Sequence, residues 1–130
     1  MAGSFSDALE IKLLDHLLKT TPFAVPANIY VALYTTAPTD AGGGVEVSGG
    51  SYERKVCNTW DGAAAGATAN TGAITFIQAT GDWGTVIAFA IFDAIAAGNF
   101  LAWADLAVNK AIQNGDTAEF AAGELDITLD

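Results

Sequence analysis

Residues 6–19 carry the clearest helical pattern in the chain. Leucine and isoleucine recur there at spacings of three and four, and on a helix they spread over an arc wider than one packing face needs. Ser6 suits the N-cap position, and Glu10 suits the positive end of the helix dipole. The pattern therefore predicts one N-terminal amphipathic helix, which Pro22 and Pro26 bring to an end.

The width of this apolar arc leaves two interpretations open. In the favoured one, the helix lies across an open end of the folded domain and buries its leucines there. In the other, the helix is wedged between its own domain and a neighbouring subunit, which Leu13 and Leu17 contact. We expect a homotrimer with either this helix or the sheet face that bears Trp103 near the subunit contact.

From residue 28 onward the apolar positions follow a period of two, which is typical of strands. Ile29, Val31 and Leu33 point to one face of this strand, and Tyr30, Ala32 and Tyr34 point to the other. Both faces are apolar, so the strand is expected to be central or covered by the helix. Further strands are predicted at 45–47, 52–60, 74–79, 86–93, 99–106, 108–113, 117–121 and 125–129. Strands repeating about every 8 to 12 residues between turn signals predict a mainly β fold, a small antiparallel β-sandwich that is jelly-roll-like or immunoglobulin-like.

Length and composition fit a single domain. The chain has 130 residues, of which 52% are hydrophobic and 15% charged. We expect residues 1–26 to form the helix and a linker, and residues 27–130 to form the sandwich. The apolar content exceeds what one core of this size consumes, so part of it is expected to contact partners.

Two glycine-rich or small-residue segments interrupt the strand pattern. The excursion over residues 37–51 includes the run Gly42, Gly43 and Gly44, and we expect a flexible loop that carries function. Residues 61–73 are predicted to form a second loop, built of Gly, Ala, Thr and Asn.

The charge balance excludes several classes of partner. Fifteen acidic residues against five basic ones give a formal charge of −10, which repels phosphates, so we expect no nucleic-acid partner. No apolar run approaches the roughly 20 residues that cross a bilayer, and residues 1–6 lack the features of a signal peptide. We therefore expect no membrane partner and synthesis in a cytoplasm.

Catalytic and metal-binding chemistry has little support in the sequence. His16 is the only histidine and lies on the predicted helix, and the single Cys57 reads as a small buried hydrophobe. Most of the acidic residues sit beside glycine in turns, which leaves a glycosidase pair or a structural calcium site as minor alternatives. We expect no enzyme activity, no cofactor and no metal.

The three tryptophans divide by their neighbours. Trp83 and Trp103 border apolar strand residues and are expected to pack inside the fold or at an interface. Trp60, beside Asp61 and the small-residue loop, is the better candidate for an exposed ring.

A series of structural motifs runs along nearly the whole chain. It comprises residues 29–40 with their Ala-Pro-Thr-Asp turn, the glycine-rich 42–50 leading to Tyr52 and Arg54, the Asp-Trp-Gly turn at 82–84 before residues 89–94, the Gly-Asn-Phe-Leu at 98–101 and the closing 115–123. This series resembles a family of short tailed-bacteriophage virion proteins. Members are often labelled tail fibre proteins, while similar small β-proteins decorate or cement capsids. The chain departs from the usual pattern at Glu53, Lys55 and residues 95–97.

The resemblance implies a non-enzymatic protein of the virion, made in the host cytoplasm. We expect a capsid decoration or cement protein that binds the phage major capsid protein on the capsid surface. The alternative is a tail fibre or tail-tip component that contacts a host receptor or a glycan. A hydrolase with a carboxylate pair near Trp60 or Trp83 is a third class. The residues expected to contact partners are Leu13, Leu17, Gly42, Gly43, Gly44, Tyr52, Arg54, Trp60 and Trp103.

Overall fold

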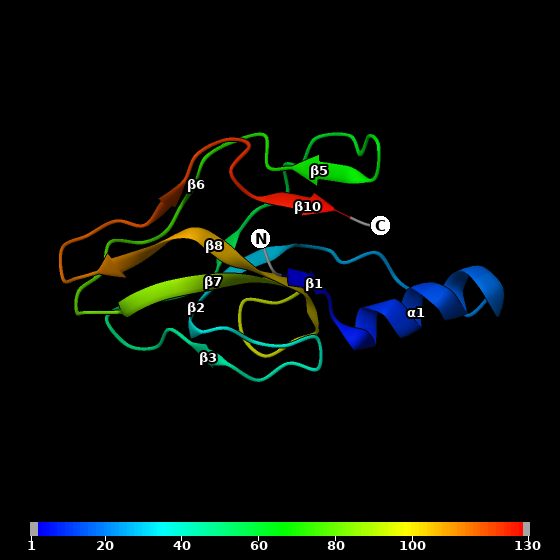
Figure 1. The fold of residues 1–130 in the computed structure, drawn as a ribbon, viewed down its shortest axis with the longest axis horizontal. Coiled ribbons are helices and arrows are strands. Elements are labelled where there is room, and N and C mark those ends of the chain that lie inside the picture. Colours follow the sequence, from blue (N-terminus) through cyan, green and yellow to red (C-terminus); the bar gives the residue numbers. More distant parts are fainter. Residues whose placement is uncertain (1–2, 129–130) are drawn as a thin grey trace.

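The computed structural model describes residues 3–128, and an antiparallel sheet forms its centre (Figure 1). The strands lie in the order β1 (Gly3–Phe5), β8 (Phe100–Ile112), β7 (Gly84–Phe92), β2 (Tyr30–Thr36) and β3 (Val45–Glu46), and β4 (Lys55–Val56) also pairs with β2. Strand β2 is central, as its two apolar faces predict, and Val31, Ala32 and Leu33 are buried.

Two short ribbons form a second layer over one face of this sheet. One pairs β5 (Ala67–Ala69) with β10 (Asp126–Thr128), and the other pairs β6 (Ile74–Thr75) with β9 (Glu119–Phe120). The main core lies between the layers, where Leu33 and Phe89 of the sheet pack in one cluster with Leu125 of the second layer. The fold is mainly β, antiparallel and sandwich-like, which confirms the predicted class.

The opposite face of the sheet is lined mostly by small side chains. Because alternate residues of a strand point to opposite faces, Ala32, Ala88 and Ala90 form a second cluster with Tyr34 and Phe92. Because alanine side chains are short, this face is shallow. Residues such as Ala37 and Trp103 pack against it in place of a second sheet.

Helix α1 (Asp7–Leu18) begins and ends where the sequence predicts. Ser6 is the N-cap, and its hydroxyl accepts a hydrogen bond from the Leu9 N–H at 3.1 Å. The predicted placement across an open end of the sandwich is wrong, because the helix projects sideways from the sheet and none of its residues is buried (Figure 1). Its N-terminal end is held while the rest extends away.

Several predicted strand boundaries change in the structure. The strands expected at 99–106 and 108–113 form one strand, β8, which bulges between the pairs Ala88 with Asp105 and Val86 with Lys110. No glycine or proline stands there to end the strand, so the extra residues are accommodated in a bulge. The strand expected at 52–60 shortens to Lys55–Val56.

Other short elements differ as well. The strands expected at 74–79, 117–121 and 125–129 shorten to β6, β9 and β10, and residue 129 lies outside the described residues. Strand β5 lies within the segment predicted to be a loop, and β1 was not predicted. Strand β5 consists of small residues and β1 has only three residues, so neither shows an apolar alternation that could reveal it.

Candidate functional site

Large apolar side chains on α1 face solvent. Ile11, Leu14, Leu17 and Leu18 are 60%, 57%, 71% and 78% exposed, and Val25 in the following segment is 90% exposed. Scattered exposed leucines are ordinary, but four on adjacent turns of one short helix form a continuous apolar surface. A helix of this length is marginal in water without packing against another element, so this surface is a candidate for a contact.

The base of α1 is fastened to the sheet by hydrogen bonds. The Ser6 hydroxyl donates to the Phe100 carbonyl at 2.7 Å, and the Ser6 N–H donates to the Leu101 carbonyl at 2.8 Å. The Asp7 N–H donates to the Asp40 carbonyl at 3.0 Å, and Leu9 packs against the main core. The direction in which the helix leaves the domain is therefore fixed by the fold.

The segment after α1 folds back along the helix. The Phe23 N–H donates to Nδ1 of His16 at 3.0 Å, and the Lys12 ammonium lies 5.6 Å from the centre of the Phe23 ring. These contacts occupy one side of the helix, which is the side that carries its polar residues. Leu13, predicted as a partner contact, is half-buried, whereas Leu17 is fully available to a partner.

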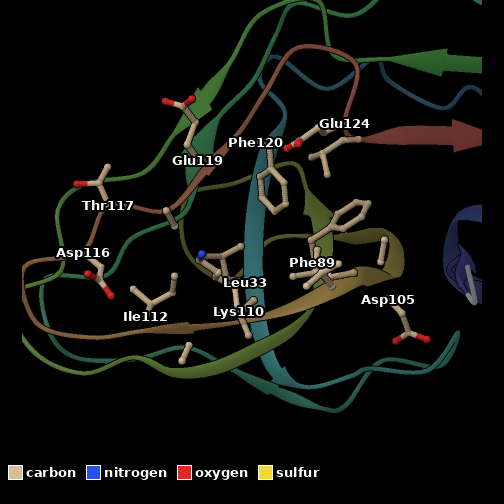
Figure 2. A pocket seen from close by; sticks show the side chains of 17 residues that line it. Leu33, Phe89, Asp105, Lys110, Ile112, Asp116, Thr117, Glu119, Phe120 and Glu124 are labelled. Atoms are coloured by element: carbon tan, nitrogen blue, oxygen red, sulfur yellow. The ribbon is translucent and has the colours of Figure 1, made fainter.

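A second feature is an open cavity of about 810 Å³ beside the outer half of β8, which we call the β8–β9 pocket. Leu33, Phe89 and Leu125 form its apolar floor, and Phe120 of β9 and Ile112 of β8 form its walls. The rings of Phe89 and Phe120 lie 6.2 Å apart in an edge-to-face arrangement at its centre (Figure 2). A cavity of this size and lining can receive several apolar side chains.

The rim of the β8–β9 pocket is acidic. Asp105, Asp116, Glu119 and Glu124 surround it, and Lys110 is its one basic residue (Figure 2). Three of these carboxylates accept local hydrogen bonds, from the Gln113 N–H, the Thr75 hydroxyl and the Ala121 N–H. Those donors are neutral, so the negative charge of the rim remains uncompensated by a salt bridge among the described residues.

Arg54, predicted as a partner contact, is turned into the fold. Its Nε and Nη2 donate to the two oxygens of Glu46 at 2.8 and 2.9 Å, and its Nη1 donates to the carbonyls of Ala94 and Ala97 at 3.0 and 2.8 Å. The guanidinium also lies 3.6 Å from the centre of the Phe92 ring. These contacts join β3 to the loop after β7 and leave little of the side chain for another molecule.

Tyr52 completes the same network. Its hydroxyl donates to Glu46 at 2.9 Å and accepts from the Leu33 N–H at 2.9 Å. Burial raises the pKa of Tyr52 far above its usual range, and the neighbouring Glu46 carboxylate raises it further. Burial opposes the charge on Arg54, but the Glu46 carboxylate outweighs this and raises the pKa of Arg54. The network therefore links β2, β3 and the loop after β7 through hydrogen bonds of buried and half-buried polar groups.

The segment predicted to be a flexible loop is well anchored. It includes β3, Val47 is buried in the main core, and the Trp83 indole donates to the Gly50 carbonyl at 2.9 Å. Gly42, Gly43 and Gly44 all adopt positive φ angles, and Gly44 lies close against the backbone of Thr36 and Pro38. The segment is thus held to the fold at several points, and its flexibility and its role in partner contact stay predictions.

Two of the tryptophans pack as predicted and one does not. Trp83 is buried in the core, and Trp103 packs against the alanine-lined face while its indole donates to Asp40 at 2.9 Å. Hydrogen bonds from Ser4 and Trp103 lower the pKa of Asp40. Trp60, expected to be exposed, is half-buried, because its indole donates to the Cys57 carbonyl at 2.9 Å and its ring packs on the core.

Buried side-chain nitrogen and oxygen atoms in the described residues all have hydrogen-bond partners. Asn70, for example, donates to the carbonyls of Gly72 and Ala121 and accepts from the Leu125 N–H, so it ties the second layer together. Across residues 3–128, no group of three or more His, Cys, Asp or Glu side chains is arranged to hold a metal ion. Among the same residues, no helix is long and apolar enough to span a membrane. Cys57 is buried, as predicted.

Sequence reasoning missed the β8–β9 pocket. Its lining comes from five separate segments of the chain, which only the tertiary fold brings together. One signal of the pocket was present in the sequence. Leu106, Val108 and Lys110 lie at alternate positions near the end of a long strand, where apolar and charged residues share one face.

Comparison with known proteins places the chain in a family. A search of curated proteins finds no match. A family model described as podophage GP4 fiber I protein gp80 matches residues 4–128, which is nearly the whole chain. This match confirms the resemblance to tailed-phage virion proteins. The chain belongs to the podophage GP4 fiber I protein gp80 family of phage structural proteins.

Proposed function

We propose that this protein is a non-enzymatic subunit of a phage fibre, which acts by assembling with other virion proteins. The description of its family names a fibre protein, and this favours a fibre over the capsid decoration role that the sequence suggested. The observation that carries the proposal is the projecting helix α1, on which Ile11, Leu14, Leu17 and Leu18 are exposed in the described part of the chain.

A structural role also accounts for the polar chemistry. The most deeply placed charged group, Arg54, is held by Glu46 and two carbonyls, and the Tyr52 hydroxyl is held by Glu46 and a backbone N–H. A catalytic group needs an accessible position next to a substrate, whereas these groups brace the domain. The acidic composition keeps the exposed surface soluble while the apolar surfaces bind.

We further propose that the subunit is a homo-oligomer, with a trimer as the expected state. Virion appendages repeat one chain by symmetry, so a weak contact between two copies is multiplied by valency. The surface of α1 supplies such a contact, because its direction is fixed by the hydrogen bonds of Ser6 and Asp7 to the sheet.

A capsid decoration protein that binds the major capsid protein is the second candidate. It is favoured by the presence of two separate apolar surfaces, one on α1 and one around the β8–β9 pocket, where Val108 is 78% exposed. A decorating subunit needs one surface for its own copies and another for the shell.

The copy number and position of the protein in the virion test these roles. Quantitative mass spectrometry of purified particles is expected to find a few copies for each appendage, and labelled antibodies are expected to mark the tail. A copy number on the order of hundreds with label over the head would instead establish the decoration role. Absence from purified particles would refute both.

A further inference from the structure

The molecule carries two apolar surfaces that differ in shape and charge. One is the outer part of α1, which we call the α1 tip and define as Leu14, Leu17, Leu18 and Lys19. The other is the β8–β9 pocket. The outer end of β8 and α1 lie at opposite ends of the molecule (Figure 1). One surface is convex and the other concave, so each has the shape that the other lacks.

We propose that the α1 tip docks into the β8–β9 pocket of a second copy of the chain, in a head-to-tail contact. This inference rests on the proposed function as a repeating subunit. A helix that lays apolar side chains into a groove is a common mode of protein recognition. The pocket of about 810 Å³ has room for leucine side chains, which would contact exposed Val108 and half-buried Leu106 and Phe120, while Phe89 lies buried beneath them.

Charge complementarity favours a second copy as the occupant. The chain has only five basic residues, and two of them, Lys12 and Lys19, lie on α1 or at its C-terminal end, Lys12 against the Phe23 ring and Lys19 at 4.0 Å from Asp15. The pocket rim carries four carboxylates and one lysine. Between residues 11 and 19 the two lysines exceed the single carboxylate of Asp15, whereas the whole chain has a formal charge of −10, so the acidic rim repels the tip less than it repels most of the remaining surface.

The rival arrangement, in which two α1 helices pack against each other, is less well matched. With Ile11, Leu14 and Leu18 in a parallel seam, Glu10 of one helix and Asp15 of the other would occupy the flanking positions that face each other. Like charges at those positions oppose association. Only about three helical turns are available to offset that repulsion.

Within residues 3–128, no strand pairs with the outer side of β8 where it borders the pocket. Strand β1 pairs only with residues 102–104 of β8, so residues 105–112 have no described neighbour on their outer side. Lys110 lines the pocket from this half of β8. Lysines on an edge strand oppose pairing with a further strand, so this edge favours a helix as the occupant.

A head-to-tail contact has a consequence for assembly. Each copy uses two different surfaces, so the contact either closes into a ring, such as the expected trimer, or continues as a filament. Either outcome repeats identical subunits. The contact is also expected to weaken at high salt, because its charged part lies at an exposed rim.

Mixing of two complementary variants of the full chain tests the proposal. The tip variant L14D/L18D keeps the pocket, and the rim variant D105K/E119K keeps the tip. Both changes lie on side chains that are not buried, and circular dichroism with thermal unfolding checks that each variant folds. The control E53K/D61K changes the charge by the same amount as the rim variant, at exposed positions outside the pocket lining.

Light scattering after size-exclusion chromatography is expected to show oligomers for the wild type and the control. Each variant alone is expected to associate at least about tenfold more weakly. The two variants mixed are expected to form a one-to-one heterodimer that grows no further. A rim variant that associates like the wild type, a mixture without heterodimer, or a monomeric wild type would overturn the proposal.

A second measurement uses an unaltered pocket. A photoreactive group attached to L18C is expected to cross-link to pocket segments 105–112 or 116–125 of another copy. Cross-links to α1 of another copy would overturn the proposal. This failure is distinct from failure of the fibre role, which depends on the location of the protein in virions.

Discussion

The guanidinium of Arg54 binds the carboxylate of Glu46 through two hydrogen bonds of 2.8 and 2.9 Å. Arg54 is buried, while Glu46 keeps a quarter of its side chain exposed. The pair joins the short strand β3 to the loop after β7 through the carbonyls of Ala94 and Ala97. A segment whose glycines suggest flexibility is therefore held by a charged brace.

Loss of this brace is expected to destabilise the domain. Arg54→Ala leaves Glu46 without its charged partner and two carbonyls without donors, and the free energy of unfolding should fall by about 2 to 4 kcal/mol. The stability of Arg54→Lys should lie between those of the wild type and Arg54→Ala, because lysine keeps the charge but cannot bind a carboxylate through two parallel hydrogen bonds. Urea unfolding measures the change. The exposed neighbour Lys55→Ala is the control, and an equal loss there would contradict the role of the brace.

Gly44 is expected to tolerate no side chain. Its φ is +75°, and a Cβ would lie 2.6 Å from the Thr36 carbonyl oxygen. Gly43 has a similar φ of +81° but open space around the same position, so it is a matched control. Gly43→Ala should cost about 1 to 2 kcal/mol from the backbone conformation, and Gly44→Ala clearly more because of the added clash. Equal thermal shifts for the two variants would show that the close approach is unimportant.

The patterns with strong periodicity were predictable from the sequence. The helix boundaries follow from Ser6 and the leucine spacing, and the central position of β2 follows from its two apolar faces. The buried state of Trp83 and Cys57 also follows from their apolar strand neighbours. These features depend on local propensity and burial, which a single sequence encodes directly.

The remaining features depend on contacts between distant segments. Arg54 was expected to meet a partner, because nothing near it in sequence shows that Ala94 and Ala97 lie against it. The projection of α1 and the β8–β9 pocket also arise from the packing of segments far apart in the chain. A wide apolar arc predicts that a helix will be covered, but it does not say by which molecule.

Asp93 is expected to make the domain sensitive to acid. Burial tends to raise its pKa, but hydrogen bonds from the Asn99 N–H and side-chain amide outweigh this, and the pKa of Asp93 lies below its ordinary value of 3.8. A carboxyl group whose pKa is lower in the folded state stabilises the fold at any pH above its pKa in the unfolded chain. This contribution is lost as the pH falls through its pKa in the folded state.

The variant Asp93→Asn isolates this effect. Because Asp93 is only half-buried and solvent still screens its carboxylate, the variant should lose only about 1 kcal/mol at neutral pH, and its stability should fall less steeply below about pH 4. Chemical unfolding at a series of pH values measures the slope. Asp61→Asn, at an exposed carboxylate that accepts no hydrogen bond from the described residues, should keep the wild-type profile.

Tyr52 is expected to make the domain sensitive to alkali. Burial raises the pKa of Tyr52 above its ordinary value of 10.0, with a further increase from Glu46, so the folded state keeps the phenol protonated where the unfolded chain ionises. A group whose pKa is raised in the folded state contributes its full stabilisation at any pH below its pKa in the unfolded chain. For Tyr52 this contribution is lost as the pH rises above about 10. The free energy of unfolding should then fall by about 1.4 kcal/mol per pH unit for this tyrosine.

Tyr52→Phe separates the two consequences of this hydroxyl. At neutral pH the variant should lose about 1 to 3 kcal/mol, because the Leu33 N–H loses its acceptor and Glu46 loses a donor. Above pH 10 its stability should decline less steeply than that of the wild type. Phenolate absorbance recorded during unfolding at each pH follows the ionisation directly. Tyr30→Phe is the control, because the Tyr30 hydroxyl bonds to none of the described residues, and it should leave the stability at neutral pH close to the wild-type value. An alkaline slope that Tyr52→Phe leaves unchanged would contradict the role assigned to Tyr52.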